Sequence, residues 1–257
     1  MCQASAYHSY VELAGYVATA LSRAVGRIDV TGTANLPYTG PAIVAINHTT
    51  IVDVAPSLSA LYKAGLRPSL RCGQEGCEAT HGHVRFLASE LVFANPFFGP
   101  IIRHAGFIPV GSGRSAAAAL SAAIDALRRG EIVGIFPEGD VAASPDGSPR
   151  KFRIGIGRMA LETGATIVPV AHHDARVIGS GTVGESLRGA MTSIVRRPTV
   201  RVNIGAPIRA AEYAGRTLAE TVSLVQDRVT AAWRAIASHE AWDGLAGKRA
   251  VRGITRR

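Results

Sequence analysis

Residues 42–53 read AIVAINHTTIVD and place a polar turn between an apolar run and the start of a helix. The run AIVAIN over 42–47 follows a Pro/Gly turn and predicts a buried strand. The next helix is expected over 53–64, because its apolar positions recur at helical spacing before Gly65. This order of strand, turn and helix is the unit from which α/β folds are built.

The same alternation continues on both sides of this stretch. A long helix is expected to begin at Thr217, where the spacing to Glu220 matches a capping box. Strands alternate with helices from about residue 27 to 205, which predicts an α/β fold: a single domain with a mixed, largely parallel twisted sheet flanked by helices. The further strands are expected over 27–33, 106–110, 131–136, 165–171 and 199–205, and the further helices over 115–129 and 157–163.

The two ends of the chain differ in composition from this core. Residues 5–26 carry apolar side chains at helical spacing and predict an N-terminal amphipathic helix. It either lies at a membrane interface or packs on the domain, and packing is favoured because its polar face lacks a basic row. The tail over 248–257 is basic and is expected to be a solvated terminus or a weak anchor to anionic lipid. We therefore divide the chain into residues 1–26, a main domain over 27–240 and a tail over 241–257.

The charge balance is strongly basic, with a formal net charge of +9. This favours a negatively charged partner, either nucleic acid, an anionic membrane or a phosphorylated or CoA-type substrate, although an arginine-rich composition by itself gives the same charge. Nucleic acid is least favoured, because no basic patch is interleaved with aromatic residues. Three unevenly placed cysteines predict a reducing compartment. Without a secretory signal or an apolar run of about 20 residues, the protein is expected to be cytoplasmic and peripheral to the membrane at most.

The turn after the first apolar strand carries His48 and, five positions later, Asp53. On a straight α-helix these side chains would point about 140° apart, so they can meet only if His48 lies in the strand-to-helix turn and the chain folds Asp53 back toward the ring. An imidazole exchanges protons near neutral pH, and a carboxylate beside it would fix its tautomer. The carboxyl end of a strand is also where open α/β sheets build their sites. A histidine followed by an aspartate is common in any chain, so this pair alone does not establish catalysis.

A second constellation, FPEG over 136–139, ends another buried strand. Pro137 stops the hydrogen bonding of the strand, Gly139 allows a turn with positive φ, and Glu138 is expected at the mouth of the sheet. A carboxylate or a nest of backbone N–H groups there could hold an acceptor or a developing oxyanion. Taken alone, this segment is more simply interpreted as an ordinary strand-to-loop turn.

Taken in their order along the chain, these motifs resemble the glycerolipid acyltransferase family, whose type member is 1-acylglycerol-3-phosphate acyltransferase. The resemblance covers about residues 27 to 210. Each motif is weakly specific, and the identification rests on their order. The motifs are the histidine and aspartate of the first turn, Glu90-Leu91, GFIPV over 106–110, FPEG over 136–139, Phe152-Arg-Ile-Gly155 and Ile167-Val-Pro-Val170.

The resemblance implies a mechanism and assigns residues to it. His48 would be the general base, oriented by Asp53, and would take a proton from the acceptor hydroxyl, which attacks the thioester of acyl-CoA or acyl-carrier protein directly. The resemblance implies no metal and no tightly held cofactor. The implied partners are the acyl donor, a lipid acceptor and an anionic membrane surface, with no nucleic acid. The acceptor-binding motif corresponds to Phe136, Pro137, Glu138 and Gly139, and the motif near the acyl chain to Val168 and Pro169.

Two motifs depart from the usual pattern of the family. Ser112 stands where an arginine usually follows the Ile-Pro-Val strand, and Asp140-Val141 stands where the third motif usually has Thr-Arg or Ser-Arg. The missing arginines would hold the phosphate of the acceptor in a bidentate geometry, and an acidic residue would repel it. Arg114 and Arg153 are expected to supply positive charge instead, so a lysophospholipid remains the leading acceptor. The alternatives are a non-phosphorylated acceptor, or a catalytically idle homologue that binds lipid or membrane.

The segment before Glu90 is rich in residues that bind metals. Cys72, Cys77, His81 and His83 could hold zinc, but their spacing matches no common structural pattern. A polar surface loop is therefore the favoured interpretation, and no metal site is predicted.

Overall fold

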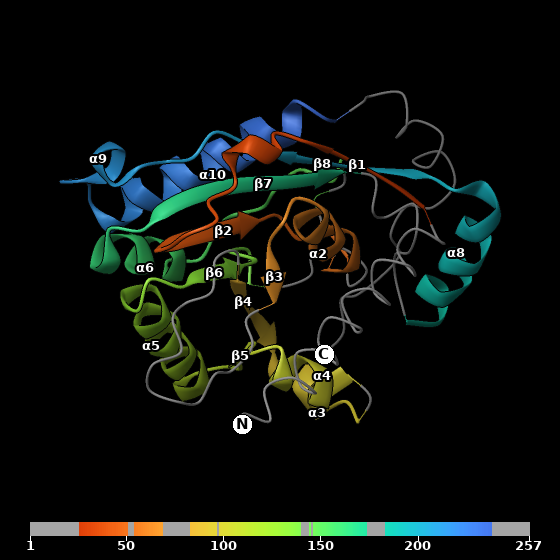
Figure 1. Cartoon of the computed structure of the whole chain (residues 1–257), viewed down its shortest axis with the longest axis horizontal. Coiled ribbons are helices and arrows are strands. Elements are labelled where there is room, and N and C mark those ends of the chain that lie inside the picture. Colours follow the sequence, from red (N-terminus) through yellow and green to blue (C-terminus); the bar gives the residue numbers. More distant parts are fainter. Residues whose placement is uncertain are drawn as a thin grey trace, which may run out of the picture.

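The computed structural model describes residues 26–50, 54–68, 83–96, 98–139, 144, 146–173 and 183–237. Within these residues eight strands form one sheet (Figure 1). Seven follow the order β1-β8-β7-β2-β6-β4-β3, and β5 pairs beside β4. Every pairing between these strands is parallel except that of β7 with β8, which confirms the predicted mixed, largely parallel sheet. The strands are β1 (Arg27–Thr31), β2 (Ala42–Ile46), β3 (Arg67–Pro68), β4 (His83–Ser89), β5 (Ile108–Val110), β6 (Ile132–Ile135), β7 (Thr166–His173) and β8 (Thr199–Ile204).

Helices cover both faces of this sheet, so the molecule has three layers. Helix α2 packs on one face, and α5, α6 and α10 pack on the other. None of the helices in the described part of the chain has the length and hydropathy needed to cross a membrane. The helices are α2 (Val54–Lys63), α3 (Glu90–Ala94), α4 (Phe98–His104), α5 (Arg114–Arg128), α6 (Gly155–Thr163), α8 (Val183–Arg196), α9 (Ala210–Tyr213) and α10 (Leu218–Arg234).

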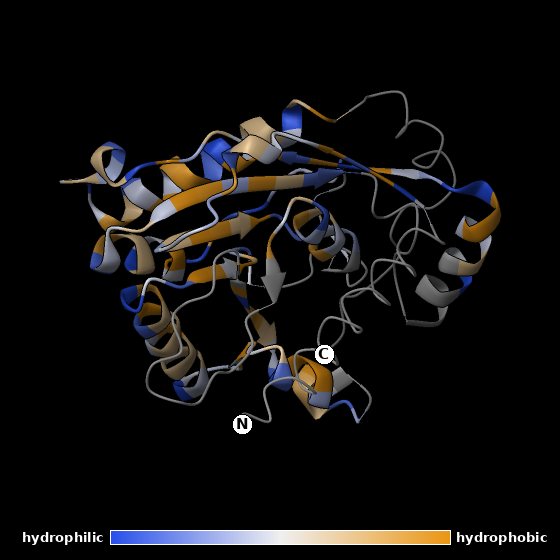
Figure 2. Ribbon diagram, viewed as in Figure 1, coloured by the Kyte–Doolittle hydropathy of each residue, from blue (hydrophilic) through white to orange (hydrophobic). Residues whose placement is uncertain are grey.

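Strand β2 lies at the centre of the sheet, which explains why its sequence is an unbroken apolar run. All its residues from Ala42 to Ile46 are buried, with β7 on one side and β6 on the other. Val44 and Ile46 belong to the core under α2, whereas Ile43 and Ala45 belong to the core under α5, α6 and α10. Figure 2 shows this strand as an apolar band between helices. Because successive side chains point to opposite faces, a strand covered on both faces needs no polar side.

Helix α10 begins where the sequence predicted. Thr217 is its N-cap: the Thr217 Oγ1 accepts the Glu220 backbone N–H at 3.3 Å, and the Glu220 carboxylate accepts the Thr217 backbone N–H at 2.7 Å. The predicted capping box is therefore confirmed, and it satisfies two donors near the start of the helix. Val222, Val225 and Val229 then bury one face of the helix in the core.

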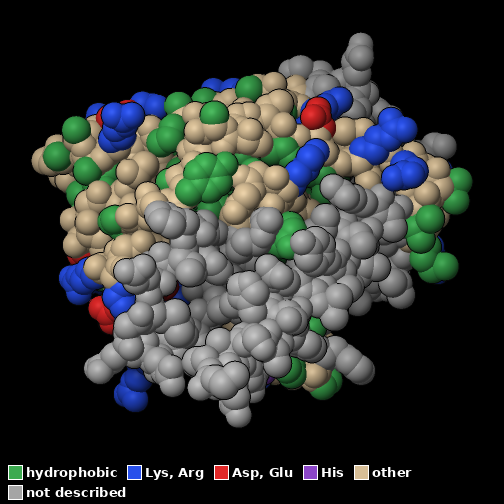
Figure 3. Space-filling model, viewed as in Figure 1, with side chains coloured by type: hydrophobic (Ala, Val, Ile, Leu, Met, Phe, Trp, Pro, Cys, Tyr) green, Lys and Arg blue, Asp and Glu red, His purple; other side chains and the backbone are tan. Residues whose placement is uncertain are grey.

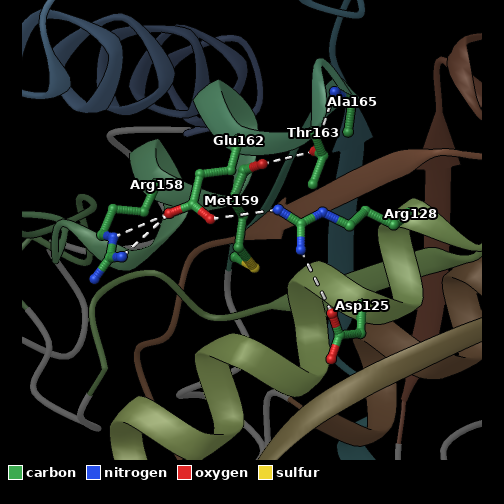
Figure 4. A network of polar contacts seen from close by, with 7 residues as sticks. All are labelled: Asp125, Arg128, Arg158, Met159, Glu162, Thr163 and Ala165. Atoms are coloured by element: carbon green, nitrogen blue, oxygen red, sulfur yellow. Dashed lines mark hydrogen bonds and ion pairs between the residues drawn. The ribbon is translucent and has the colours of Figure 1, made fainter.

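Ion pairs on the surface connect α5 with α6 (Figure 4). Glu162 of α6 lies 3.1 Å from Arg158 of the same helix and 3.9 Å from Arg128 of α5. Arg128 also lies 3.6 Å from Asp125, one turn earlier in α5. These side chains are exposed, so each pair is worth no more than about 1 kcal/mol. The two helices are therefore held in place mainly by their buried apolar faces.

Most predicted elements are confirmed. Six helices and strands of the fold were not predicted, namely β3, β4, α3, α4, α8 and α9. Residues 83–89 form β4, so His83 begins a strand instead of belonging to a surface loop. The available signal was the alternation of the buried Val84 and Phe86 with Arg85, which spans too few residues to stand out. Helix α8 was not predicted either, although its apolar residues Met191, Ile194 and Val195 recur at helical spacing. The predicted helix over 5–26 and the tail over 241–257 lie outside the described residues.

Gly157 marks a close approach of α6 to α10. A Cβ atom at this position would lie 2.7 Å from Val222 Cγ2 and 2.8 Å from Leu218 Cδ1. We predict that Gly157→Ala lowers the free energy of unfolding, measured by urea denaturation, by about 1–3 kcal/mol through overpacking. Gly155→Ala in the same helix is the control, because its Cβ would meet nothing nearer than 3.9 Å, and it should leave stability unchanged or raise it. Equal effects of the two substitutions would contradict this packing.

Candidate active site

The candidate site lies at one edge of the sheet, which we call the carboxyl edge, where the parallel strands β2, β6 and β7 end. Ala45 of β2 pairs with Ile135 of β6 and with Pro169 of β7, so the segments at the ends of the three strands lie side by side. The carboxyl edge of a parallel sheet is the usual ligand-binding edge of open α/β proteins. The segments are Asn47-His48 after β2, FPEG over 136–139 after β6, and His172-His173 at the end of β7.

Asn47 fastens the end of β2 to β7. Its side-chain Nδ2 donates to the His172 carbonyl oxygen at 3.2 Å, and its Oδ1 accepts the His172 backbone N–H at 2.8 Å. The His172 Nε2 lies 2.7 Å from the Asn47 carbonyl oxygen, which can only accept, so this ring nitrogen is assigned as the donor. Both residues are fully buried. These bonds continue the contact of the two strands beyond the last ladder pair and fix the backbone just before His48.

His48 is held by its backbone and presents its ring at the carboxyl edge. Its backbone N–H donates to Glu138 Oε1 at 2.9 Å, which joins the turn after β2 to the turn after β6. Its imidazole is half-buried and lies against the Phe136 ring, with centroids 4.5 Å apart and an interplanar angle of 32°. Two motifs that lie 90 positions apart in the sequence are therefore in direct contact.

Glu138 is buried, with 7% of its surface exposed. Burial raises the pKa of its carboxyl above the ordinary value of 4.5, and the backbone N–H groups of His48 and Arg150 and the nearby imidazoles of His48 and His172 oppose this rise. The carboxyl group thus accepts bonds from the backbone of two separate segments. These contacts show that Glu138 connects the turn after β2 with the turn after β6. The FPEG sequence alone does not reveal this role.

Arg153 packs on the FPEG turn and brings positive charge to it. Its backbone N–H donates to the Pro137 carbonyl oxygen at 2.8 Å, and its Nε donates to the Glu138 carbonyl oxygen at 3.2 Å. Gly139 has the predicted positive φ, of 69°, and a Cβ there would lie 2.3 Å from Arg153 Nε. The Arg153 side chain is exposed, so its charge faces solvent beside the site. The structure therefore brings Arg153 together with Pro137, Glu138 and Gly139.

Arg114 lies at the same edge of the sheet, after the end of a different strand. It begins α5 after the carboxyl end of β5, and its side chain is exposed. Beside it, Ser115 Oγ donates to the Glu90 carboxylate and accepts the Gly111 backbone N–H at 3.1 Å. This contact joins the start of α3 to the start of α5 and was not foreseen from the sequence. Ser112, which replaces the usual arginine of the family, is exposed in the preceding turn.

Val168 and Pro169 lie within β7 and not at its end. They pair with Val44 and Ala45 of β2, and both are buried. Val168 packs in the apolar core on the α2 side of the sheet. Their observed role is to hold the two central strands together.

Several residues of interest lie outside the described residues. These are Asp53, Asp140, Val141, Cys72, Cys77 and His81. In the described part of the chain, no group of three or more His, Cys, Asp or Glu side chains is placed to hold a metal ion.

The fold and the site define the class of protein. A profile of the Acyltransferase family matches residues 27–173, which is more than half of the chain. This match contains β2, β6 and β7 and the turns that carry His48 and Glu138. The chain therefore belongs to the Acyltransferase family, which confirms the resemblance read from its motifs.

Two curated relatives are each named 1-acyl-sn-glycerol-3-phosphate acyltransferase. The relative from Borreliella burgdorferi is 31% identical over 164 residues, covering 63% of this chain and 57% of the relative. The relative from Bacillus subtilis is 23% identical over 189 residues, covering 74% and 77%. An uncharacterized protein of Mycobacterium leprae is 31% identical over 148 residues, covering 56% and 35%. The match thus spans less than two thirds of the length of the Borreliella and Mycobacterium relatives.

A solved structure has the same fold. It is the crystal structure of PlsC, the 1-acyl-sn-glycerophosphate (LPA) acyltransferase of Thermotoga maritima, with a TM-score of 0.59. The two chains are 19% identical, and the similarity covers 95% of this chain and 90% of that one. The likeness supports the α/β fold class predicted from the sequence.

The raised pKa of Glu138 makes its effect on stability depend on pH. Above pH 4.5 the folded state holds the Glu138 proton more tightly than the unfolded state, so the contribution of Glu138 to stability falls as the pH rises through this window. Glu138→Gln cannot ionise, and we predict that its free energy of unfolding rises relative to wild type over the same window. Urea denaturation at a series of pH values measures this difference. A constant difference would contradict the burial of an ionisable carboxyl here.

Proposed function

We propose that this protein transfers a fatty acyl group from a thioester donor, either acyl-CoA or acyl-carrier protein, to the hydroxyl of a lipid acceptor. The observation that carries the proposal is the bond from the His48 backbone to Glu138, which joins the two chemistry-bearing motifs at the carboxyl edge. Membership of the Acyltransferase family supports the reaction class. The names of the Borreliella and Bacillus relatives support a 1-acylglycerol-3-phosphate acceptor.

In the proposed reaction His48 acts as general base. Its imidazole takes the proton of the acceptor hydroxyl, and the oxygen attacks the carbonyl carbon of the thioester. A new C–O bond forms, the C–S bond of the donor breaks, and the departing thiolate receives the proton from His48. The acyl group passes directly between substrates, so no covalent acyl-enzyme and no metal or resident cofactor is required.

Two further groups would assist this base. The proposed partner of the imidazole is Asp53, whose carboxylate would orient the ring and stabilise the imidazolium that forms. Glu138 would act through the backbone, because its bond to the His48 N–H sets where the ring stands against Phe136. Asp53 would thus assist the proton transfer, whereas Glu138 would fix the position of the base.

The proposed acceptor site lies beside the FPEG turn. Arg153 is fixed on this turn by its bonds to Pro137 and Glu138 and has an exposed guanidinium, which can bind a phosphate in a bidentate manner. Arg114 adds a second exposed positive charge at the same edge. A lysophospholipid such as 1-acylglycerol-3-phosphate is therefore the proposed acceptor, reached from the cytoplasmic face of the membrane, where the protein would be bound peripherally.

The replacement of the usual arginines by Ser112 and Val141 favours a second candidate function. A protein without them would use a non-phosphorylated acceptor, or would bind lipid without transferring an acyl group. An acceptor series that includes a phosphate-free monoacylglycerol separates these cases.

The catalytic role of His48 has a direct test. We predict that His48→Ala lowers the rate of thiol release from long-chain acyl-CoA by about 10² to 10⁴, because the general base is lost. His104→Ala is the matched control, since His104 is exposed near the end of α4 and has no part in the proposed reaction. Thiol release is followed by absorbance, and circular dichroism verifies folding. A folded His48→Ala variant with wild-type turnover would reject the mechanism.

The role of Arg153 concerns the acceptor. We predict that Arg153→Gln raises KM for lysophosphatidic acid about tenfold or more, because a charge-assisted pair with phosphate is lost. KM for a phosphate-free monoacylglycerol should stay the same. Arg158→Gln serves as control, because Arg158 pairs with Glu162 on the exposed side of α6. An equal rise for both acceptors would show that Arg153 does not contact the phosphate.

A further inference from the structure

Large apolar side chains are exposed on two helices next to the site, α3 and α8. Val195 on α8 is 86% exposed and Leu91 on α3 is 83% exposed. Met191 and Ile194 on α8 and Val92 on α3 are also exposed. Contact of this much apolar surface with water is unfavourable, so such groups indicate a surface that an apolar partner covers.

Three apolar side chains near the end of α8, those of Met191, Ile194 and Val195, are exposed on one side of the helix. Ser193 is 2% exposed, so its side of the helix rests on the molecule. At about 100° per residue, Met191, Ile194 and Val195 fall within one arc of about 100° on the other side. The exposed apolar side chains therefore share one helix face. Figure 2 shows α8 with apolar residues at one end of the molecule.

Both apolar groups lie at the edge of the sheet that holds the site. Helix α8 leads into β8, whose first half pairs with the end of β7, with Arg201 opposite His173. Helix α3 begins directly after the carboxyl end of β4. In the sheet, β6, β2 and β7 lie between β4 and β8, so the strand that precedes His48 lies between the strands next to α3 and α8. The two apolar groups therefore flank the site along the carboxyl edge.

Positive charge accompanies the group on α8. Residues 188–197 contain three arginines and no acidic residue, and Arg188 and Arg196 are exposed. Figure 3 shows Lys and Arg side chains beside hydrophobic ones at the end of the molecule that carries α8. Apolar side chains bordered by arginine match the chemistry of an anionic bilayer, which has negative head groups above an apolar layer.

We infer that α3 and α8 form a membrane-docking surface, which binds an anionic bilayer and turns the site toward the lipid. This surface consists of Leu91, Val92, Met191, Ile194 and Val195. This inference rests on the proposed use of a lipid acceptor. An acceptor whose acyl chain stays in the bilayer would bring its hydroxyl to His48 by moving only its head group. The docking surface thus explains how a water-insoluble substrate reaches the carboxyl edge.

Vesicle flotation with the full chain tests the docking surface. The probes are phosphatidylcholine vesicles with and without phosphatidylglycerol, and no acyl donor is present. M191S/V195S should bind phosphatidylglycerol vesicles about tenfold more weakly than wild type, because two inserted apolar side chains are lost. R188Q/R196Q should weaken the same binding by about tenfold, with less sensitivity to added salt. Leu161→Ser is the control, because Leu161 is also exposed but lies in the last turn of α6, toward the opposite edge of the sheet.

The outcomes distinguish a membrane-docking surface from a dimer interface and from a failure of the proposed function. Wild-type binding by M191S/V195S, or equal losses in M191S/V195S and Leu161→Ser, would overturn the inference. A wild-type protein that is dimeric in sedimentation, with a monomeric M191S/V195S variant, would show that the surface pairs two chains and would also overturn it. A wild-type protein that binds vesicles through this surface but transfers no acyl group would reject the proposed function alone. Acyl transfer to detergent-dispersed acceptor, with vesicle binding unaffected by M191S/V195S, would reject the docking surface alone.

Discussion

The hydrogen bond from the His48 backbone to the buried Glu138 carboxyl is the interaction on which the site depends. It joins the turns after β2 and β6, and the amide of Asn47 joins the end of β2 to β7 on the other side. The backbone around His48 is therefore fixed from two neighbouring strands, which leaves only its ring to be placed. Phe136 supplies the surface against which the ring lies. If His48 is the base of the proposed reaction, this fixed backbone reduces the reorganisation needed before its ring accepts a proton.

The central position of β2 makes this arrangement possible. Its apolar residues fill both cores of the sheet, so a shift of its register would disturb close packing on both faces at once. The turn that follows is therefore anchored to the buried centre of the sheet. Rigid strands with variable turns at one edge let the same fold accept different substrates, which agrees with the altered residues at Ser112 and Asp140 within an otherwise ordered set of motifs.

The fold could be predicted further than the site. Unbroken apolar runs marked β2 and β7, which are covered on both faces, and helical spacing with a capping box marked α10. Helix α8 was not predicted although Met191, Ile194 and Val195 also recur at helical spacing; the structure shows that these side chains face outward and not into the core. Motif order predicted that His48 and Glu138 share a site. The contact of Asn47 with His172 spans 125 positions and leaves no local signal, so it emerged only once β2 and β7 were paired.

The central claim is that this edge of the sheet transfers acyl groups from a thioester to a lipid hydroxyl. The most direct measurement is thiol release from long-chain acyl-CoA or acyl-carrier protein by the wild-type protein, with and without lysophosphatidic acid, combined with mass spectrometry of the lipid product. We expect release that requires the acceptor and yields phosphatidic acid in equal amount. No release with lysophosphatidic acid or with phosphate-free acceptors, from either donor, would contradict the claim.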